Sequence, residues 1–575
     1  MSDTAIQPFP LEHLWAIGPQ ILLSVWGLLA LLIDSAFLRG RTSAQRRQTL
    51  GVFSLLGVFA VVAYLMAPMP THSEIATDSS LFYGTLAGDM LTSSFNGLLA
   101  VLLGLVIALS MAWDFTEDWG AYFALLFWAT VGMMFLIAAE ELLILFLALE
   151  FMTICLYLAS AFEKQRRRSP EAGLKYFVYG SVSSAMFLFG LSLIYGLTGT
   201  TYLHGIQAAL VAGPTPGLGG NLAGAMALML VLVGFGFKVA AVPFHQWAPD
   251  AYEGAPAPVS AWIATGSKIA SFIALMKVLV FALSPWAVGV DALTGPGWVM
   301  IVAVLAALTM TFCNFAALAQ RNLKRLLAYS SIAHAGYILV GVLAAMVTIR
   351  ANPSESAASV LFYLVIYGFT TIGAFAVAAW LARDRGGDDI EDLNGLGYES
   401  PILAACIVIL MLSLIGMPPL AGFFAKLYIF MEVVNTQDSA RNVMLTLVAL
   451  ALANSVVSAF YYVRVLKAMF LRRAERKMPA APRMIAWPIG LTTLVVIGFG
   501  LAPSPLLESM RGAAGTMLTI NPPFVYTPGE VIEETFLERY GIDEEAQSLQ
   551  LNPTAGADDR PRGTSAGDGL AEARR

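Results

Sequence analysis

Residues that bind metals or redox centres are scarce in this sequence. It has three cysteines, Cys155, Cys313 and Cys406, and each lies alone in an apolar stretch, so they form no CxxC motif and no zinc or iron–sulfur spacing. The five histidines include no pair at i, i+4 spacing and no HExxH motif, and neither GxGxxG nor GxxxxGKS is present. These absences predict that the chain itself binds no metal, no nucleotide and no redox cofactor.

Charge is scarce as well. Only 13% of the 575 residues are charged and 58% are hydrophobic, whereas a soluble domain has about 25% charged residues. Apolar runs of about 20 residues recur and alternating strand patterns do not, which predicts an all-α polytopic membrane protein in a lipid bilayer rather than a barrel. The net charge of −6 and the lack of a basic face argue against a nucleic-acid partner.

Fourteen hydrophobic segments are each long enough to cross a hydrocarbon core of about 30 Å. They cover residues 14–37, 50–68, 91–113, 121–139, 141–162, 171–197, 223–245, 258–281, 299–319, 327–348, 357–382, 401–431, 443–470 and 485–508.

The basic residues alternate between the loops that join these spans. Eighteen lie in the loops at 39–47, 164–168, 321–325, 383–385 and 472–483, and only Arg350 and Arg441 lie in the opposite loops. By the positive-inside rule the first set is cytoplasmic and both termini lie outside. Residues 1–13 hold no basic residue, so no cleaved signal peptide is expected.

Seven basic residues remain inside the spans. Lys175, Lys277, Arg464 and Lys467 lie near span ends, where long side chains are expected to reach the interface.

Lys238, Lys268 and Lys426 lie deep in their spans, as does Glu150, and a basic residue at a helix centre costs about 2.5–3.5 kcal/mol to insert. A structural ion pair explains one glutamate and one lysine, but not three lysines against one glutamate. Because burial disfavours an ammonium and a nearby carboxylate restores it, such groups predict a proton relay with an electrostatic trigger.

Two of these lysines lie beside helix breakers. Lys238 precedes Pro243, and Lys426 follows Pro418 and Pro419, so the spans 223–245 and 401–431 are expected to be discontinuous unless the prolines only shape packing. The two broken spans are five spans apart. Since five is odd, the sequence predicts two inverted repeats, the fourth to eighth spans (121–281) and the ninth to thirteenth spans (299–470).

The remaining segments flank these repeats. The first three spans (1–113) precede them, and the last span (485–508) and an external acidic tail (509–575) follow. The tail holds six basic and eleven acidic residues and is expected to be mostly disordered, with a short amphipathic helix at 529–540.

Several long motifs resemble the antiporter-like membrane subunits of respiratory complex I. They are the Leu149-Glu150 step, EAGLKYF at 171–177, the run ending Pro243-Phe244-His245, and QRNLKRLLAYSSIAHAGY at 320–337. Within that family, WAPDAYEGAP at 247–256 is most similar to subunit N of bacterial NADH:quinone oxidoreductase.

The resemblance implies roles for individual positions. Glu150 matches a glutamate that pairs with Lys238, Lys268 matches a central relay lysine, and Lys426 matches the lysine that faces the exit. Secondary candidates are Lys175, near the cytoplasmic uptake side; His334, which is equally consistent with a packed core residue; and His245, as a structural or hinge residue.

The resemblance also implies an inner-membrane subunit of a translocating NADH dehydrogenase in the electron transport chain. NADH, FMN, iron–sulfur clusters and quinone would belong to other subunits, and the partners would be neighbouring membrane subunits. Two alternatives remain: a subunit of a multi-subunit Na⁺/H⁺ antiporter, and a scaffold that transports nothing.

Overall fold

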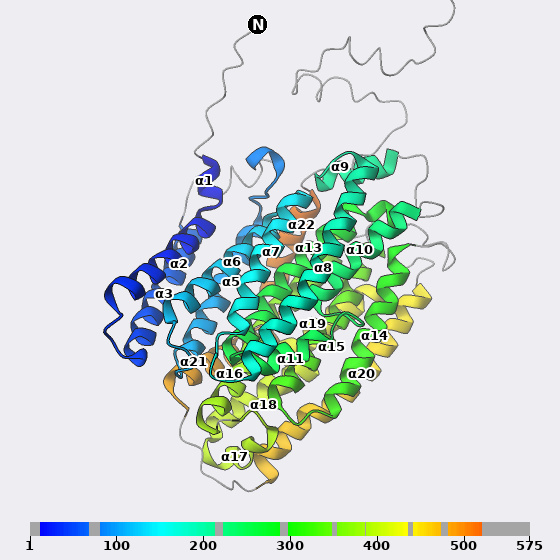
Figure 1. Ribbon diagram of the computed structural model, residues 1–575. Helices are drawn as coiled ribbons and strands as arrows, with labels where there is room; N and C mark the ends of the chain where they lie inside the picture. The colour runs from blue at the N-terminus through cyan, green and yellow to red at the C-terminus, as the bar shows by residue number, and fades with distance from the viewer. Residues whose placement is uncertain are drawn as a thin grey trace, which may run out of the picture. The chain divides into compact units, whose positions relative to one another are not determined.

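The apolar segments of the sequence form long helices. The computed structural model describes residues 12–67, 81–212, 222–287, 297–347, 353–385, 387–434, 441–472 and 481–519. Within these ranges there is no strand, only three isolated bridges, and the helices run side by side as one bundle (Figure 1). The all-α membrane fold is therefore confirmed.

Thirteen helices of the described ranges are long and apolar enough to cross a membrane. Twelve are single helices: α2 (Gly18–Phe37), α3 (Ser43–Met66), α5 (Met90–Ser110), α6 (Trp119–Ala138), α7 (Leu142–Ser160), α8 (Arg168–Thr198), α10 (Leu222–Val239), α14 (Trp298–Leu318), α15 (Leu323–Val347), α16 (Pro353–Arg385), α20 (Arg441–Leu471) and α21 (Arg483–Leu501). The remaining predicted span, the twelfth at 401–431, is divided into α18 (Pro401–Ile415) and α19 (Ala421–Val434).

The thirteenth long helix, at 257–282, is composite. It consists of α12 (Ala257–Trp262), a π-helical turn (Ile263–Ser267), α13 (Lys268–Met276) and a second π-helical turn (Lys277–Ala282). Its most hydrophobic window is entirely buried, as are those of α15 and α16, so these three helices form the centre of the bundle. α2 and α3 lie at one edge (Figure 1).

Short elements connect the long helices. They are α1 (Glu12–Ala16), α9 (Leu203–Ala212), α11 (Trp247–Gly254), α17 (Leu396–Glu399), and 3₁₀ turns at Leu81–Gly84, Ser284–Ala287 and Ile390–Leu393. Several long helices begin at side-chain caps: Thr42 caps α3, Asp89 caps α5 and Glu141 caps α7, each by accepting a hydrogen bond from a backbone N–H of the first turn.

Both predicted helix breaks are present, and they share one geometry. α10 ends at Val239, four residues before Pro243, and α18 ends at Ile415, four residues before Pro419. A proline lacks the N–H that would bond the carbonyl four residues earlier, and its ring clashes with that carbonyl, so each helix stops there.

The residue three positions before each proline has a left-handed backbone: Ala240 has φ 59° and Gly416 has φ 91°. The prolyl peptide bond is cis in both breaks.

The last predicted boundary is wrong. The final span ends at Leu501, and a further helix, α22 (Ser504–Thr519), occupies the segment assigned to the start of the tail at residue 509. Its buried side chains, among them Met510, Ala513 and Met517, pack where α22 meets α5 and α16. The predicted helix at 529–540 lies outside the described residues.

Lys277 was predicted to reach the membrane interface, but it is buried in the bundle instead. Its residue is 2% exposed, and Nζ donates to Glu140 Oε1 at 2.6 Å and to the carbonyls of Ile137 and Ala139 at the end of α6. Arg464 makes the matching contact in the second half, donating to the carbonyls of Leu318 (2.8 Å) and Gln320 at the end of α14. Both cations bind the negative end of a helix dipole, which explains why their side chains turn into the bundle instead of extending to the membrane interface.

Candidate functional site

Lys238 lies in the last turn of α10 and is 5% exposed. Its Nζ donates a hydrogen bond to Thr153 Oγ1 of α7 and lies 5.4 Å from the centre of the Phe237 ring. Because the Thr153 hydroxyl donates its own proton to the carbonyl of Leu149 at 2.5 Å, its lone pairs are directed at the ammonium.

Glu150 lies on α7, three residues before Thr153, and accepts a hydrogen bond from Ser184 Oγ of α8. Among the described residues no ion pair within 4.0 Å joins Glu150 to Lys238, so the direct pair expected from the resemblance is not formed here. Both groups are instead held by hydroxyls, and Thr153 lies on the same helix as the carboxylate. The two ions can therefore influence each other without contact.

Lys268 begins α13, directly after the first π-helical turn. Its residue is 1% exposed, and Nζ donates to the carbonyl oxygen (2.7 Å) and to Oγ (2.6 Å) of Ser331 on α15. Tyr367 of α16 donates its hydroxyl to the same Oγ at 2.8 Å. One serine thus connects the central lysine to a tyrosine hydroxyl.

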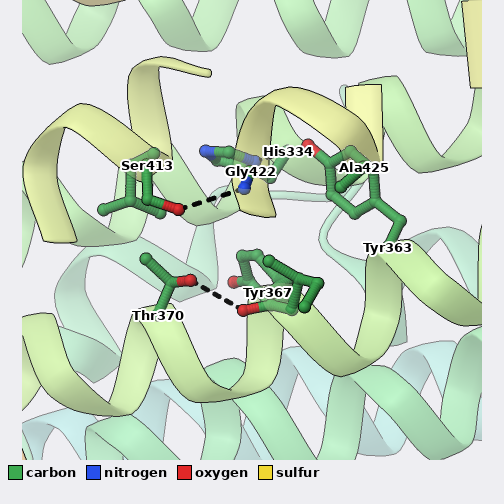
Figure 2. A pocket seen from close by; sticks show the side chains of 9 residues that line it. His334, Tyr363, Tyr367, Thr370, Ser413, Gly422 and Ala425 are labelled. Carbon is green, nitrogen blue, oxygen red and sulfur yellow. Dashed lines mark hydrogen bonds between the residues drawn. The ribbon is translucent and has the colours of Figure 1, made fainter. Parts of the chain in front are cut away.

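A small cavity lies next to this tyrosine (Figure 2). Its lining includes His334 and Tyr363 as well as Tyr367, Thr370 and Ser413. The volume that the centre of a water molecule can occupy in this cavity is ≈ 10 Å³. This volume is near the lower limit for one bound water.

His334 is directed to this cavity. Nδ1 lies 2.6 Å from the Tyr363 hydroxyl and Nε2 lies 3.5 Å from the Tyr462 hydroxyl. Leu414, Gly422 and Ala425, from the two sides of the second helix break, also line the cavity, so it separates the Lys268 cluster from the break.

Lys426 occupies the second break. Its Nζ donates to the carbonyls of Ile415 (2.8 Å) and Leu414 (3.4 Å), which end α18, and to Ser455 Oγ of α20 (3.3 Å). The ring of Tyr337 lies 4.7 Å away. The carbonyls freed by the proline break therefore hold the ammonium, as the negative end of a helix does for a cation.

The three deep lysines share one property. Within the described ranges, none of Lys238, Lys268 and Lys426 has a carboxylate oxygen within 4.0 Å, and each is held by hydroxyl or carbonyl oxygens. Other buried lysines differ: Lys277 pairs with Glu140 at 2.6 Å, and Lys324 pairs with Asp388 at 3.2 Å.

The secondary candidates lie elsewhere. Lys175 is 40% exposed in its side chain and forms ion pairs with Glu171 (2.9 Å) and Asp250 (2.8 Å). His245 lies in the turn between α10 and α11, and the centre of its ring lies 5.2 Å from that of Phe312, with the two rings nearly perpendicular. Neither touches a deep lysine in the described structure.

The hydroxyl partners were missed by the sequence reasoning. Thr153, Ser331 and Ser455 hold the lysines, and Tyr337 and Tyr367 lie against two of them. Thr153 could have been identified from the sequence, because it lies one helical turn from Glu150, on the same helix face, in an apolar span. The others lie on different spans from their lysine and have no local signal.

A family model described as "NADH:quinone oxidoreductase/Mrp antiporter, TM" matches residues 139–453, a range that contains all four charged groups of this site. The chain belongs to this family. Its members with curated names include NADH-quinone oxidoreductase subunit N 2 of Acidobacterium capsulatum, 39% identical over 501 residues that cover 86% of this chain and 97% of the relative. Subunit N of Rhodospirillum rubrum is 37% identical over 500 residues, covering 86% of this chain and 96% of the relative.

Solved structures agree with this membership. A chain of respiratory complex I from Thermus thermophilus with bound aureothin is similar to this family member with a TM-score of 0.68 and 31% identity, covering 86% of this chain and 99% of the other. A chain of the Mrp complex from Dietzia sp. shares the fold with a TM-score of 0.70 at 19% identity, covering 88% and 98%. In the described ranges no group of three or more His, Cys, Asp or Glu side chains could hold a metal ion.

Proposed function

We propose that this chain is a proton-translocating membrane subunit of a bacterial NADH:quinone oxidoreductase. In this proposal NADH, FMN, the iron–sulfur clusters and quinone react in other subunits, and neighbouring membrane subunits transmit the energy. The relatives named NADH-quinone oxidoreductase subunit N support it.

The observation that carries the proposal is how the three deep lysines are held. A lysine whose role is structural is expected to keep a carboxylate partner, because an unpaired buried charge is costly. Lys238, Lys268 and Lys426 are held by neutral acceptors instead. A neutral acceptor leaves no buried anion behind when the proton departs, so either protonation state of the lysine can be populated.

The proposed path follows these contacts. A change in a neighbouring subunit alters the charge or position of Glu150, and Lys238 responds through the segment that carries Thr153. The proton then reaches Lys268 and passes Ser331, Tyr367 and the cavity beside His334 to Lys426. Moving each charge against the membrane potential requires about 2.3 kcal/mol per 100 mV.

Two inverted repeats organise this path in the proposal. They are supported by the shared geometry of the two proline breaks and by the equivalent capping of α6 by Lys277 and of α14 by Arg464. These elements are five spans apart in each case. The excess of basic residues in one set of loops supports the further proposal that both termini lie on the periplasmic side of the inner membrane.

The alternative is a Na⁺/H⁺ antiporter subunit. The fold suits it, but identity is 31% to the complex I chain and 19% to the Mrp chain. Purification with NADH dehydrogenase subunits supports the first proposal, and purification with antiporter subunits alone would reverse the choice.

The test uses the assembled complex in proteoliposomes. Glu150→Ala and Lys238→Ala are expected to lower the number of protons pumped per NADH oxidised while the complex remains assembled. Lys467→Ala, at the far end of α20, is the control and is expected to pump normally. An unchanged proton stoichiometry in both test variants refutes the relay.

A further inference from the structure

The first turn of α15 carries two adjacent cations that reach across to α11. Arg325 Nη1 lies 2.7 Å from Asp250 Oδ1 and 3.0 Å from Glu253 Oε2. Lys324 Nζ donates to the carbonyl of Ala255, directly after α11, at 3.1 Å. The two cations therefore hold both the face and the end of this short helix.

A second set of charges fixes Lys324 itself. Its side chain is fully buried and lies 3.2 Å from Asp388, whose side chain is also fully buried. Asp388 in turn accepts from Arg166 at 3.0 Å, which lies between α7 and α8. The loop after α16 is thus joined to the loop before α8 through one buried carboxylate.

The stability of α15 does not explain these cations. The N-terminal turn of a helix favours anions, so Lys324 and Arg325 oppose the dipole of their own helix. Burying Lys324 adds a desolvation penalty. The position of Lys324 and Arg325 is explained instead by their contacts with α11 and with the carbonyl directly after it.

The held element lies between two relay lysines. α11 follows the break after Lys238, and α12 begins at Ala257, eleven residues before Lys268. α8 also contacts α11, through Lys175 to Asp250 and Arg168 to Glu253. Burial raises the pKa of Asp250, but the hydrogen bonds from Lys175 and Arg325 outweigh this effect and lower the pKa below its usual value.

We propose that Lys324 and Arg325, with Asp250 and Glu253, form a clamp by which the second half of the chain positions α11 and, through it, Lys238 and Lys268. The inference rests on the proposed relay for its functional part only. Lys324 and Arg325 are positioning residues, since they touch no relay group in the described structure.

The experiment compares two arginines that contact Glu253. Arg325→Gln removes the contact from α15, and Arg168→Gln removes the contact from α8, where the Arg168 side chain is 64% exposed. Hydrogen–deuterium exchange of the 247–254 amides is measured in the intact complex, together with protons pumped per NADH. Partly exposed pairs contribute about 0.2–1 kcal/mol each, so losing two in Arg325→Gln is expected to speed exchange about two- to thirtyfold.

The expected result is faster exchange and lower proton stoichiometry in Arg325→Gln, partial recovery of both in Arg325→Lys, and near wild-type behaviour in Arg168→Gln. Unchanged exchange in Arg325→Gln overturns the clamp. Faster exchange of the 247–254 amides with a normal number of protons pumped per NADH overturns the role of the clamp in positioning Lys238 and Lys268. If Arg325→Gln does not assemble, the Asp250→Asn and Glu253→Gln double variant weakens the Arg325 contacts from the α11 side, together with the α8 contacts of Lys175 and Arg168. It is compared with Arg168→Gln and judged by the same criteria.

The outcome is separable from the proposed function. If Lys238→Ala pumps normally, the relay fails, yet exchange of α11 still decides whether the clamp exists.

Discussion

Ser331 offers the sharpest perturbation of the central lysine. Its Oγ accepts from Lys268 at 2.6 Å, and its carbonyl accepts at 2.7 Å. Ser331→Ala deletes the first acceptor and keeps the second, with almost no change in volume. A hydrogen bond to a charged group contributes about 1.5–3 kcal/mol, so the ammonium form of Lys268 loses about that much stabilisation.

The sign of the effect follows directly. Ser331 stabilises the protonated lysine, so its loss makes Lys268 release its proton at a lower pH. Since one pH unit corresponds to about 1.36 kcal/mol, the alkaline limb of the pumping profile is expected to move down by about one to two pH units.

The assay is proton uptake into inverted vesicles, driven by NADH and followed with a pH-sensitive dye over a range of pH, with NADH oxidation measured in parallel. Ser330→Ala is the matched control. Ser330 is the adjacent residue on α15 and is equally buried, but its hydroxyl bonds Tyr462 and no lysine. Profiles that coincide with the wild type in Ser331→Ala, or equal shifts in both variants, refute the reasoning.

Three further predictions follow from the other lysines. Lys426→Arg keeps a charge that does not dissociate in the working range, so pumping is expected to fall by more than about tenfold at wild-type assembly, and normal pumping would exclude proton exchange at this position. Thr153→Val removes the acceptor of Lys238 at nearly constant volume and is expected to lower proton stoichiometry, whereas Thr130→Val, a buried α6 threonine bonded only to a backbone carbonyl, is expected to leave it unchanged. Lys277→Ala leaves Glu140 buried without its cation and is expected to cost about 3–5 kcal/mol, seen as a lower inactivation temperature; the double variant Lys277→Met, Glu140→Gln is expected to recover most of it, and failure to do so would show that the pair is not the cause.

Features governed by neighbouring residues were predictable from the sequence. The prolines at 243 and 419 end their helices four residues earlier, because the missing N–H and the ring clash act at that distance. The apolar runs likewise predicted the spans, and Pro418 and Pro419 predicted the division at 416–420.

Features that depend on contacts between distant spans were not predictable. Ser331 meets Lys268 across 63 residues, and Glu140 meets Lys277 across 137. Lys324 looks like an ordinary loop cation in the sequence, yet packing buries it completely against Asp388. Residues 509–519 were assigned to the tail, but they continue α22, in which Ala513 and Ala514 are fully buried against other spans.

The relay lysines are buried and the Arg325 contacts of the clamp are partly exposed, so the two respond differently to ionic strength. Arg325, Asp250 and Glu253 are partly open to solvent, where mobile ions screen charges over about 8 Å at physiological ionic strength and about 3 Å at 1 M. Lys238, Lys268 and Lys426 lie beyond the reach of such ions and interact with fixed dipoles. Added salt is therefore expected to weaken the contacts of Arg325 with α11, but not the buried Lys324–Asp388 pair, and to leave the energetics of the buried protons unchanged.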